Sequence, residues 1–112
     1  ALSQMQMFQS SDFVKFCLNI RSARPPGKQF QYFSLNSHLL SAVVGNAFGK
    51  PLAEVARENL FEKIGITDFG WPADPQGVTH GWGDLRLRST DMARLGWLVL
   101  QRGKWGDQQV IS

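Results

Sequence analysis

The sequence is short of the residues from which disulfides and metal centres are built. Its 112 residues include one cysteine, Cys17, so an internal disulfide is excluded. Cys17 lies in the apolar run of residues 13–20, and we interpret it as a buried structural thiol rather than a nucleophile. The two histidines, His38 and His80, are far apart and fit no ligand spacing such as His-x-x-x-His. We therefore expect neither a metal ion nor another cofactor.

Long apolar runs and blocks of like charge are also missing. No stretch approaches the roughly 20 apolar residues that a membrane-spanning helix needs, so we expect no membrane span. The net charge is +3 and the basic residues are scattered apart from Arg86 and Arg88, which argues against a nucleic-acid partner. The chain begins at Ala1 and ends at Ser112 without a signal peptide, a helix cap or a tail, so we expect an internal fragment. Its composition carries no sign of an oligomeric state.

The residues that are present are typical of a globular protein. The composition is 43% hydrophobic and 19% charged, with four tryptophans and eight phenylalanines, which suits a buried interior or an aromatic-lined cleft. The length allows one domain at most, and no repeat, low-complexity tract or linker divides it. We therefore expect residues 1–112 to belong to a single domain.

Apolar spacing and capping residues predict four helices. They run from Ser10 or Ser11 to Ile20, over residues 37–48, over residues 51–64, and from Ser89 or Thr90 to just before Gly103. Gly49 and Gly65 stand where left-handed C-caps belong. Each helix has an expected buried face. In chain order, these faces are Phe13, Phe16, Cys17 and Ile20 in the first helix; Leu39, Leu40, Val43, Val44 and Ala47 in the second; Leu52, Val55, Ala56, Leu60 and Ile64 in the third; and Met92, Leu95, Leu98 and Val99 in the fourth.

The remaining segments predict little regular structure. Residues 1–9 fit no element, and residues 66–88 are expected to be irregular because of their prolines and glycines. Residues 85–87 alternate like a short strand, Trp105-Gly106-Asp107 fits a tight turn, and residues 109–111 resemble the start of a strand. The predicted fold class is therefore mainly α, with short strands or extended segments.

One junction stands out as a place for chemistry. The turn Pro25-Pro26-Gly27 is followed by the extended-looking stretch Phe30-Gln31-Tyr32-Phe33 and then by the helix that we expect to start near Ser37. Side chains two apart in an extended segment point the same way, so Tyr32 and Ser34 can address one spot. The alternative is structural, with Tyr32 as a core aromatic and Ser34 as a turn or cap residue.

Other catalytic patterns were tested along the chain. Every serine lacks a lysine three positions later, so the nucleophile of a Ser-x-x-Lys enzyme is not in this sequence. We interpret Asp68, Asp74 and Asp84 as turn formers rather than as a pair of catalytic carboxylates. His80 is expected in a loop, where a role in a cleft stays open. No phosphate-binding loop is present.

Six short patterns in order carry a resemblance to a known family. They are Phe30-x-Tyr32-x-Ser34-x-x-x-x-Leu39-Leu40, Gly49-Lys50-Pro51-Leu52, Leu60-Phe61-Glu62-Lys63-Ile64-Gly65-Ile66, Trp71-Pro72-x-Asp74-Pro75-x-Gly77, Gly81-Trp82-Gly83 and Asp91-Met92-Ala93-Arg94-Leu95-Gly96. In this order and spacing the chain resembles the middle of the serine beta-lactamase and penicillin-binding-protein-like superfamily. It is most similar to the class C-like serine hydrolases, which include esterases, DD-peptidases and 6-aminohexanoate-dimer hydrolases.

The resemblance implies roles for two residues. Tyr32-Phe33-Ser34 matches the family's second motif in its Tyr-x-Ser form, so Tyr32 would be the general acid/base and Ser34 would hydrogen-bond the catalytic lysine or the substrate. Asn36 is the competing residue, because a shifted register would make it the motif's amide. The family's third motif is absent: Lys63-Ile64-Gly65 is expected to cap a helix, and Lys104-Trp105-Gly106 to form a surface turn.

The resemblance also implies a function. The chain would be the helical region of an α/β beta-lactamase-like catalytic domain that cleaves an amide or ester through an acyl-serine, with the nucleophile outside this segment. Its partner would be a small-molecule amide or ester, whether beta-lactam, peptide, simple ester or oligoamide. The resemblance suggests a periplasmic or secreted protein. The alternative is a catalytically inactive relative that serves as a binding or cell-wall interaction domain.

Overall fold

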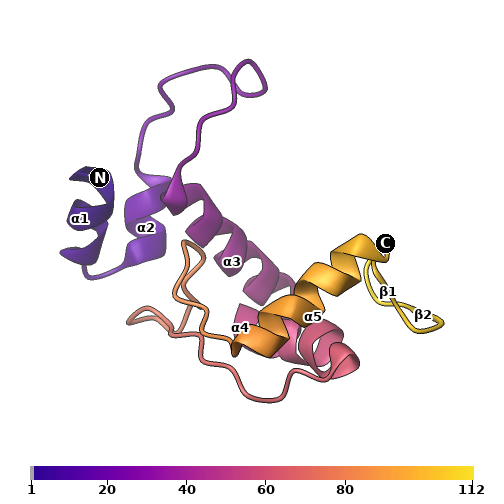
Figure 1. The fold of residues 1–112 in the computed structure, drawn as a ribbon. Coiled ribbons are helices and arrows are strands. Elements are labelled where there is room, and N and C mark those ends of the chain that lie inside the picture. Colours follow the sequence, from indigo (N-terminus) through magenta and orange to yellow (C-terminus); the bar gives the residue numbers. More distant parts are fainter. Residues whose placement is uncertain (1) are drawn as a thin grey trace.

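The computed structural model describes residues 2–112, and the backbone of this part of the chain is mostly helical (Figure 1). Within those residues, five α-helices follow one another and a short β-hairpin comes last. The expected mainly α fold class with short strands is confirmed. The sequence pattern had predicted four helices, and the additional one is at the amino-terminal end.

The first two helices pack against each other. Helix α1 (Leu2–Phe8) lies in a stretch that fitted no element, and helix α2 (Phe13–Leu18) lies close to its predicted range. The N-cap of α2 is Asp12 rather than Ser10 or Ser11, because the Asp12 carboxylate accepts a 2.9 Å hydrogen bond from the Lys15 N–H. The thiol of Cys17 is buried as expected and lies 3.5 Å from the sulfur of Met7.

Helix α3 (Ser34–Phe48) corrects two predictions. It begins at Ser34, not near Ser37, and it ends at Gly49, whose left-handed φ of 66° confirms the predicted C-cap. Its buried side chains belong to Leu35, His38 and Ser41. The predicted apolar stripe is wrong as a buried face, because two of its members, Leu40 and Val43, are 64% and 62% exposed.

The next helical segment is less regular than predicted. Pro51 immediately precedes helix α4 (Leu52–Ala56), which continues as one turn of π-helix, η1 (Arg57–Phe61), and one of 3₁₀-helix, η2 (Glu62–Ile64). Gly65 closes the segment with a φ of 77°. The single helix expected over residues 51–64 therefore changes its hydrogen-bonding pattern twice, although its ends were predicted correctly.

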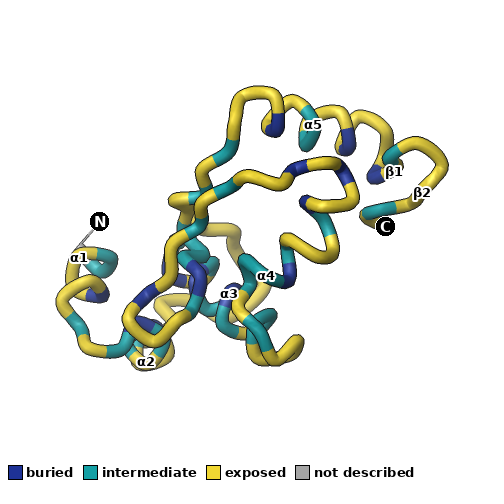
Figure 2. Tube along the Cα trace, turned by 90° about the horizontal axis from the view of Figure 1, so that it is seen from below, coloured by how far each residue is buried: buried dark blue, intermediate teal, exposed yellow. Residues whose placement is uncertain are grey.

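Helix α5 (Ser89–Leu100) and the hairpin complete the chain. The N-cap of α5 is Arg88 and no side chain caps it, so the predicted Ser89 or Thr90 cap is wrong. Of its predicted buried face, Leu98 is buried and Leu95 half-buried, whereas the side chains of Met92 and Val99 are exposed. Figure 2 shows exposed positions along most of this helix.

Strands β1 (Lys104–Trp105) and β2 (Gln108–Gln109) form an antiparallel hairpin around the turn at Gly106 and Asp107, where a turn was predicted. Lys104 and Trp105, both predicted to lie in a turn, therefore lie in a strand. Strand β2 begins one residue before the predicted start at Gln109 and covers only two residues.

The buried side chains form two hydrophobic clusters. The first cluster comprises Met7, Phe13, Cys17 and Leu35, with Phe16, Ile20, Phe33, Leu39 and Trp82 packed against it. The second comprises Phe61, Ile64, Ile66 and Leu98, with Phe69, Leu95, Trp105 and Val110 among its neighbours. Helix α3 starts at the first cluster, and α5 packs on the second.

Two long loops connect these elements. The 71–84 loop crosses α3. Among the described residues, its strand-like pairings are the isolated bridge Ala73–Thr79 within it and the bridge Gly70–Arg86 that joins the chain on either side of it. The irregular structure predicted for residues 66–88 is thereby confirmed, and the strand predicted for residues 85–87 is reduced to one bridge. The loop between α2 and α3 stands away from the helices (Figure 1).

Candidate active site

Tyr32 and Ser34 lie at the predicted junction between extended chain and helix. Phe33 has extended backbone angles and is the N-cap of α3, and Ser34 is the first helical residue. The Asn36 N–H donates to the Phe33 carbonyl at 3.0 Å, which closes the first turn three residues earlier than predicted. Burial of Leu35 against the first cluster explains this early start, because the first turn must form to place that side chain.

The two candidate residues differ in exposure. The Tyr32 side chain is 73% exposed, so the alternative in which it is a core aromatic is wrong. Ser34 is half-buried. Phe33, between them, packs on the first cluster, and this contact holds the junction in place.

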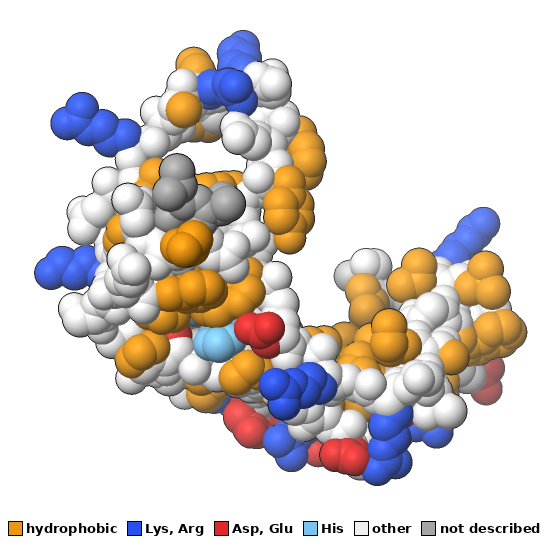
Figure 3. Space-filling model, turned by 60° about the vertical axis from the view of Figure 1, so that its left-hand side comes forward, with side chains coloured by type: hydrophobic (Ala, Val, Ile, Leu, Met, Phe, Trp, Pro, Cys, Tyr) orange, Lys and Arg blue, Asp and Glu red, His pale blue; other side chains and the backbone are white. Residues whose placement is uncertain are grey.

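A hollow of about 590 Å³ opens on one side of this junction. Gln31, Phe33 and Asn36 line it from α3 and the preceding chain, and Arg21 and Arg24 line it from the loop after α2. Among the described residues, Tyr32 and Ser34 do not contribute to its wall. Asn36 therefore lines a hollow that Tyr32 does not line. Figure 3 shows this loop as an open ring with hydrophobic, lysine and arginine side chains along its edge.

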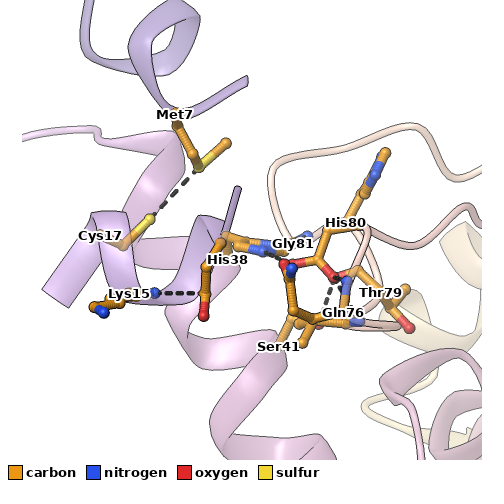
Figure 4. Close-up of polar contacts among 12 residues, drawn as sticks. Met7, Lys15, Cys17, His38, Ser41, Gln76, Thr79, His80 and Gly81 are labelled. Atoms are coloured by element: carbon orange, nitrogen blue, oxygen red, sulfur yellow. Dashed lines mark hydrogen bonds and ion pairs between the residues drawn. The ribbon is translucent and has the colours of Figure 1, made fainter. Parts of the chain in front are cut away.

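A buried histidine fixes the start of α3. His38 Nε2 lies 2.9 Å from Asp74 Oδ2, and neither side chain has any exposed surface. His38 Nδ1 accepts a hydrogen bond from the Gly81 N–H at 3.4 Å (Figure 4). A backbone N–H can only donate, so the ring proton is on Nε2 and is donated to Asp74.

Asp74 also organises its own loop. Its Oδ1 accepts hydrogen bonds from the N–H groups of Gln76 and Val78, both at 2.9 Å. The prediction that Asp74 is a turn former is confirmed, but the pairing with His38 was missed. The spacing of Leu35, His38 and Ser41 on one helix face was a usable signal for the buried side of α3. Nothing in the sequence pointed to a partner 36 residues away.

Two further contacts attach the same loop to the helices. The Ser41 hydroxyl donates to the Thr79 carbonyl at 2.6 Å in a buried position, and the Thr79 hydroxyl accepts from the Ala53 N–H at 3.1 Å. At Gly81 the backbones touch so closely that a Cβ would overlap the Ser37 carbonyl oxygen. The loop is therefore fixed along α3 from its first turn to its middle.

His80 and Asp84 form a second His–Asp pair, this time at the surface. His80 Nδ1 lies 2.9 Å from Asp84 Oδ2, and the Trp82 indole N–H donates to the same oxygen at 3.0 Å. The hydrogen bond from His80 lowers the pKa of the Asp84 carboxyl below its ordinary value of 3.8, against a smaller opposing effect of desolvation. The predicted loop position of His80 is confirmed.

The two Lys-x-Gly sequences belong to other parts of the fold than the junction at Tyr32. Lys63-Ile64-Gly65 ends η2 with a left-handed glycine, as predicted for a helix cap. Lys104-Trp105-Gly106 belongs to the β1–β2 hairpin, which Figure 1 places at the far end of α5 from the start of α3.

Residues 2–112 contain no group of three or more His, Cys, Asp or Glu side chains arranged to hold a metal ion. None of the helices described is long and apolar enough to span a membrane. Burial raises the pKa of the Cys17 thiol, which suits its structural role.

Comparison with known protein families gives a match over nearly the whole chain. The model of a protein family described as Beta-lactamase matches residues 2–111. No curated protein matches the chain. The matched range includes the junction at Tyr32, both His–Asp pairs and both hydrophobic clusters.

Proposed function

The chain belongs to the beta-lactamase family, and from this premise we propose that it is part of a serine hydrolase that cleaves an amide or ester through an acyl-serine. The proposal includes the narrower assignment to the class C-like serine hydrolases. It also places the 112 residues within a single catalytic domain whose nucleophilic serine and lysine lie outside them.

Tyr32 is the proposed general acid/base. An acid/base group must reach the reacting atoms, and the 73% exposure of Tyr32 leaves its hydroxyl free to do so. Its backbone is held by Phe33, which packs on the first cluster, and by the start of α3 directly after it. A reactive side chain on a loop that rigid elements fix at both ends is well suited to catalysis.

Ser34 is the proposed second residue of the motif, in preference to Asn36. Ser34 follows Tyr32 across Phe33, whose backbone is extended, and this extended link favours the same direction for the side chains of Tyr32 and Ser34. Asn36 instead lines the hollow shared with Gln31 and Arg24, which Tyr32 does not line. This separation supports Ser34 as the residue that hydrogen-bonds the lysine or the substrate.

The proposed reaction is an acyl transfer in two steps. The phenolate of Tyr32, stabilised by the lysine ammonium, takes the proton of the nucleophilic serine as its oxygen attacks the carbonyl carbon. The bond from that carbon to the leaving nitrogen or oxygen breaks, and Tyr32 passes the proton to the leaving group. In the second step Tyr32 takes a proton from a water molecule whose oxygen attacks the acyl carbon. The bond from that carbon to the serine oxygen breaks, Tyr32 returns the proton to the serine, and the acid is released.

The position of exposed Tyr32 at the start of α3, within a family match over residues 2–111, carries the proposal. The test is turnover of nitrocefin and a p-nitrophenyl ester by the full-length protein and by its Tyr32→Phe variant. We expect Tyr32→Phe to lower kcat by about 10²–10⁴-fold, since it removes an acid/base group and keeps the ring. Phe48→Leu, at an exposed aromatic on the other end of α3, is the matched control and should keep wild-type turnover.

A full-length protein without Ser-x-x-Lys, or one whose Tyr32→Phe variant keeps its turnover, would contradict the proposal. If the protein binds a ligand of this class without turnover and Tyr32→Phe leaves the affinity unchanged, it is the inactive binding relative instead.

A further inference from the structure

The five residues from His80 to Asp84, at the tip of the 71–84 loop, are linked to one another by side-chain contacts. His80 Nδ1 and the Trp82 indole nitrogen both contact Asp84 Oδ2, at 2.9 and 3.0 Å. The rings of His80 and Trp82 stack with centroids 4.1 Å apart and an interplanar angle of 28°. One carboxylate oxygen therefore fixes both aromatic side chains of the loop tip.

Trp71 holds the backbone of the same His80–Asp84 segment. Its indole N–H lies 2.9 Å from the His80 carbonyl and 3.0 Å from the Gly83 carbonyl. His80 and Gly83 lie towards opposite ends of the segment, so the one indole N–H that their carbonyls share links those two ends. The arrangement of His80 is thus set before any ligand arrives.

Asp84 has an unfavourable backbone conformation. Its φ is +64°, a left-handed value that is uncommon for residues other than glycine. Such conformations persist where surrounding contacts impose them, and they are frequent at functional sites. Here the hydrogen bonds to the Asp84 carboxylate offset that strain, and their effect is to orient an imidazole that is 17% exposed.

The His80–Asp84 segment lies at the amino-terminal end of α3. Gly81 contacts the backbone of Ser37 and His38, within the second turn of the helix that Ser34 begins. Trp82 packs on the first cluster, as does Phe33 next to Tyr32. Figure 1 shows the loop tip beside the start of α3, and Figure 4 shows the His80 ring directed away from the buried contacts of Ser41 and Thr79.

The hydrogen bond to Asp84 determines what His80 can bind. An ionised carboxylate only accepts, so His80 Nδ1 carries a proton, and whenever the ring holds that one proton its Nε2 is an acceptor. A ligand group that meets Nε2 must therefore donate a hydrogen bond. The leaving group of an amide offers an N–H at the scissile bond, whereas the corresponding atom of an ester is an oxygen without a proton.

We propose that His80 Nε2 accepts a hydrogen bond from the leaving-group N–H of an amide substrate, with Asp84 as the residue that positions His80. This inference rests on the proposed hydrolase function and adds a preference for amides over esters. It assigns a binding role to a histidine outside the Tyr-x-Ser motif.

The test compares two substrates with the same acyl group, p-nitroacetanilide and p-nitrophenyl acetate, in the full-length protein. His80→Phe keeps an aromatic ring on Trp82 and removes the acceptor. We expect kcat/KM for the anilide to fall about five- to tenfold, as for loss of one neutral hydrogen bond, and that for the ester to stay within about twofold. His80→Gln, which offers an amide oxygen, should restore part of the loss. Asp107→Asn in the hairpin is the control and should change neither value.

An equal fall for both substrates, or no fall for the anilide, would overturn the inference while leaving the hydrolase proposal intact. If wild-type protein turns over neither compound, the same pair serves as stable ligands, and the hydrolase proposal is decided separately by the turnover of nitrocefin. The ¹⁵N shift of His80 Nε2 should then change on adding the anilide and not on adding the ester. If only the ester is hydrolysed, the ¹⁵N shift of His80 Nε2 is measured with the anilide in the same way. In either case, an unchanged Nε2 shift on adding the anilide would contradict the role of His80.

Discussion

The first cluster, around Phe13 and Leu35, lies against a fully buried His–Asp pair, whereas the second cluster, around Ile64 and Leu98, is held by apolar contacts. The ring of His38 packs against Trp82 and Phe13, with centroids 4.8 and 6.1 Å away. Beside the second cluster Asp91 is buried, but the side chain of its partner Arg94, 3.2 Å away, is 43% exposed, and both side chains of the Arg88–Asp68 pair are mostly exposed. Among the described residues, the fully buried ion pair is therefore found at the first cluster.

This difference shows what each region contributes. Apolar packing contributes free energy of folding but tolerates small shifts, because it has little directional preference. A buried hydrogen-bonded pair has strict geometry, so it fixes one arrangement of the 71–84 loop on α3. The proposed site at Tyr32 and Ser34 adjoins the region with the directional contacts, which suits a site that must hold its geometry.

The largest effect is expected on breaking the buried pair. Asp74→Ala in the full-length protein leaves the His38 Nε2–H and two loop N–H groups without their acceptor, so we expect a loss of about 3–5 kcal/mol in the free energy of unfolding. Leu98→Ala in the second cluster should cost about 2–5 kcal/mol by leaving a cavity. Urea unfolding measures both.

The two variants should differ in activity more than in stability. In Asp74→Ala the loop no longer holds the first turns of α3, so turnover per folded molecule should fall, whereas Leu98→Ala should leave it near wild type. Equal turnover in both folded variants would mean that the buried pair has no special role at the site. Adding His38→Leu to Asp74→Ala should recover part of the lost stability, since no unpaired imidazole then remains buried.

A second pair of variants sharpens the comparison at the backbone. Gly81→Ala places a methyl group into the Ser37 carbonyl, so the loop must move off α3, at an expected cost of about 1–3 kcal/mol or more. Gly96→Ala in α5 meets no atom within 4 Å and should stabilise the protein by up to about 1 kcal/mol through helix propensity. Thermal melts of the two variants should therefore shift in opposite directions, and a tolerated Gly81→Ala would contradict the close contact.

The smallest effect concerns the exposed pair. The hydrogen bond from His80 keeps the pKa of Asp84 below 3.8 in the folded protein, so its contribution to stability is fully present above that pH and is lost as the pH falls through the folded value. In a ¹³C carboxyl NMR titration, His80→Phe should raise the pKa of Asp84 towards 3.8. An unchanged titration would show that the pair does not form in solution.

Several features of the fold followed from local sequence. Gly49 and Gly65 end their helices because only glycine readily adopts the left-handed conformation there, and the prolines and glycines of residues 66–88 predicted irregular chain. The junction between extended chain and helix at Tyr32 was predicted from the turn before it and the helix after it, whereas the exposure of Tyr32 was left open. The order of the family patterns identified the superfamily before the family match over residues 2–111 confirmed it.

The sequence by itself determined where helices end, which segments are irregular and which family the chain resembles, because caps, turns and short patterns act over a few residues. Tertiary structure alone decided which side of α3 is buried. That helix has apolar residues on more than one face, and only the 71–84 loop, by supplying Asp74 and the Thr79 carbonyl, selects the face of His38 and Ser41. These two contacts join residues that are separated by 36 and by 38 positions in the sequence, and contacts over such separations leave no trace in local periodicity.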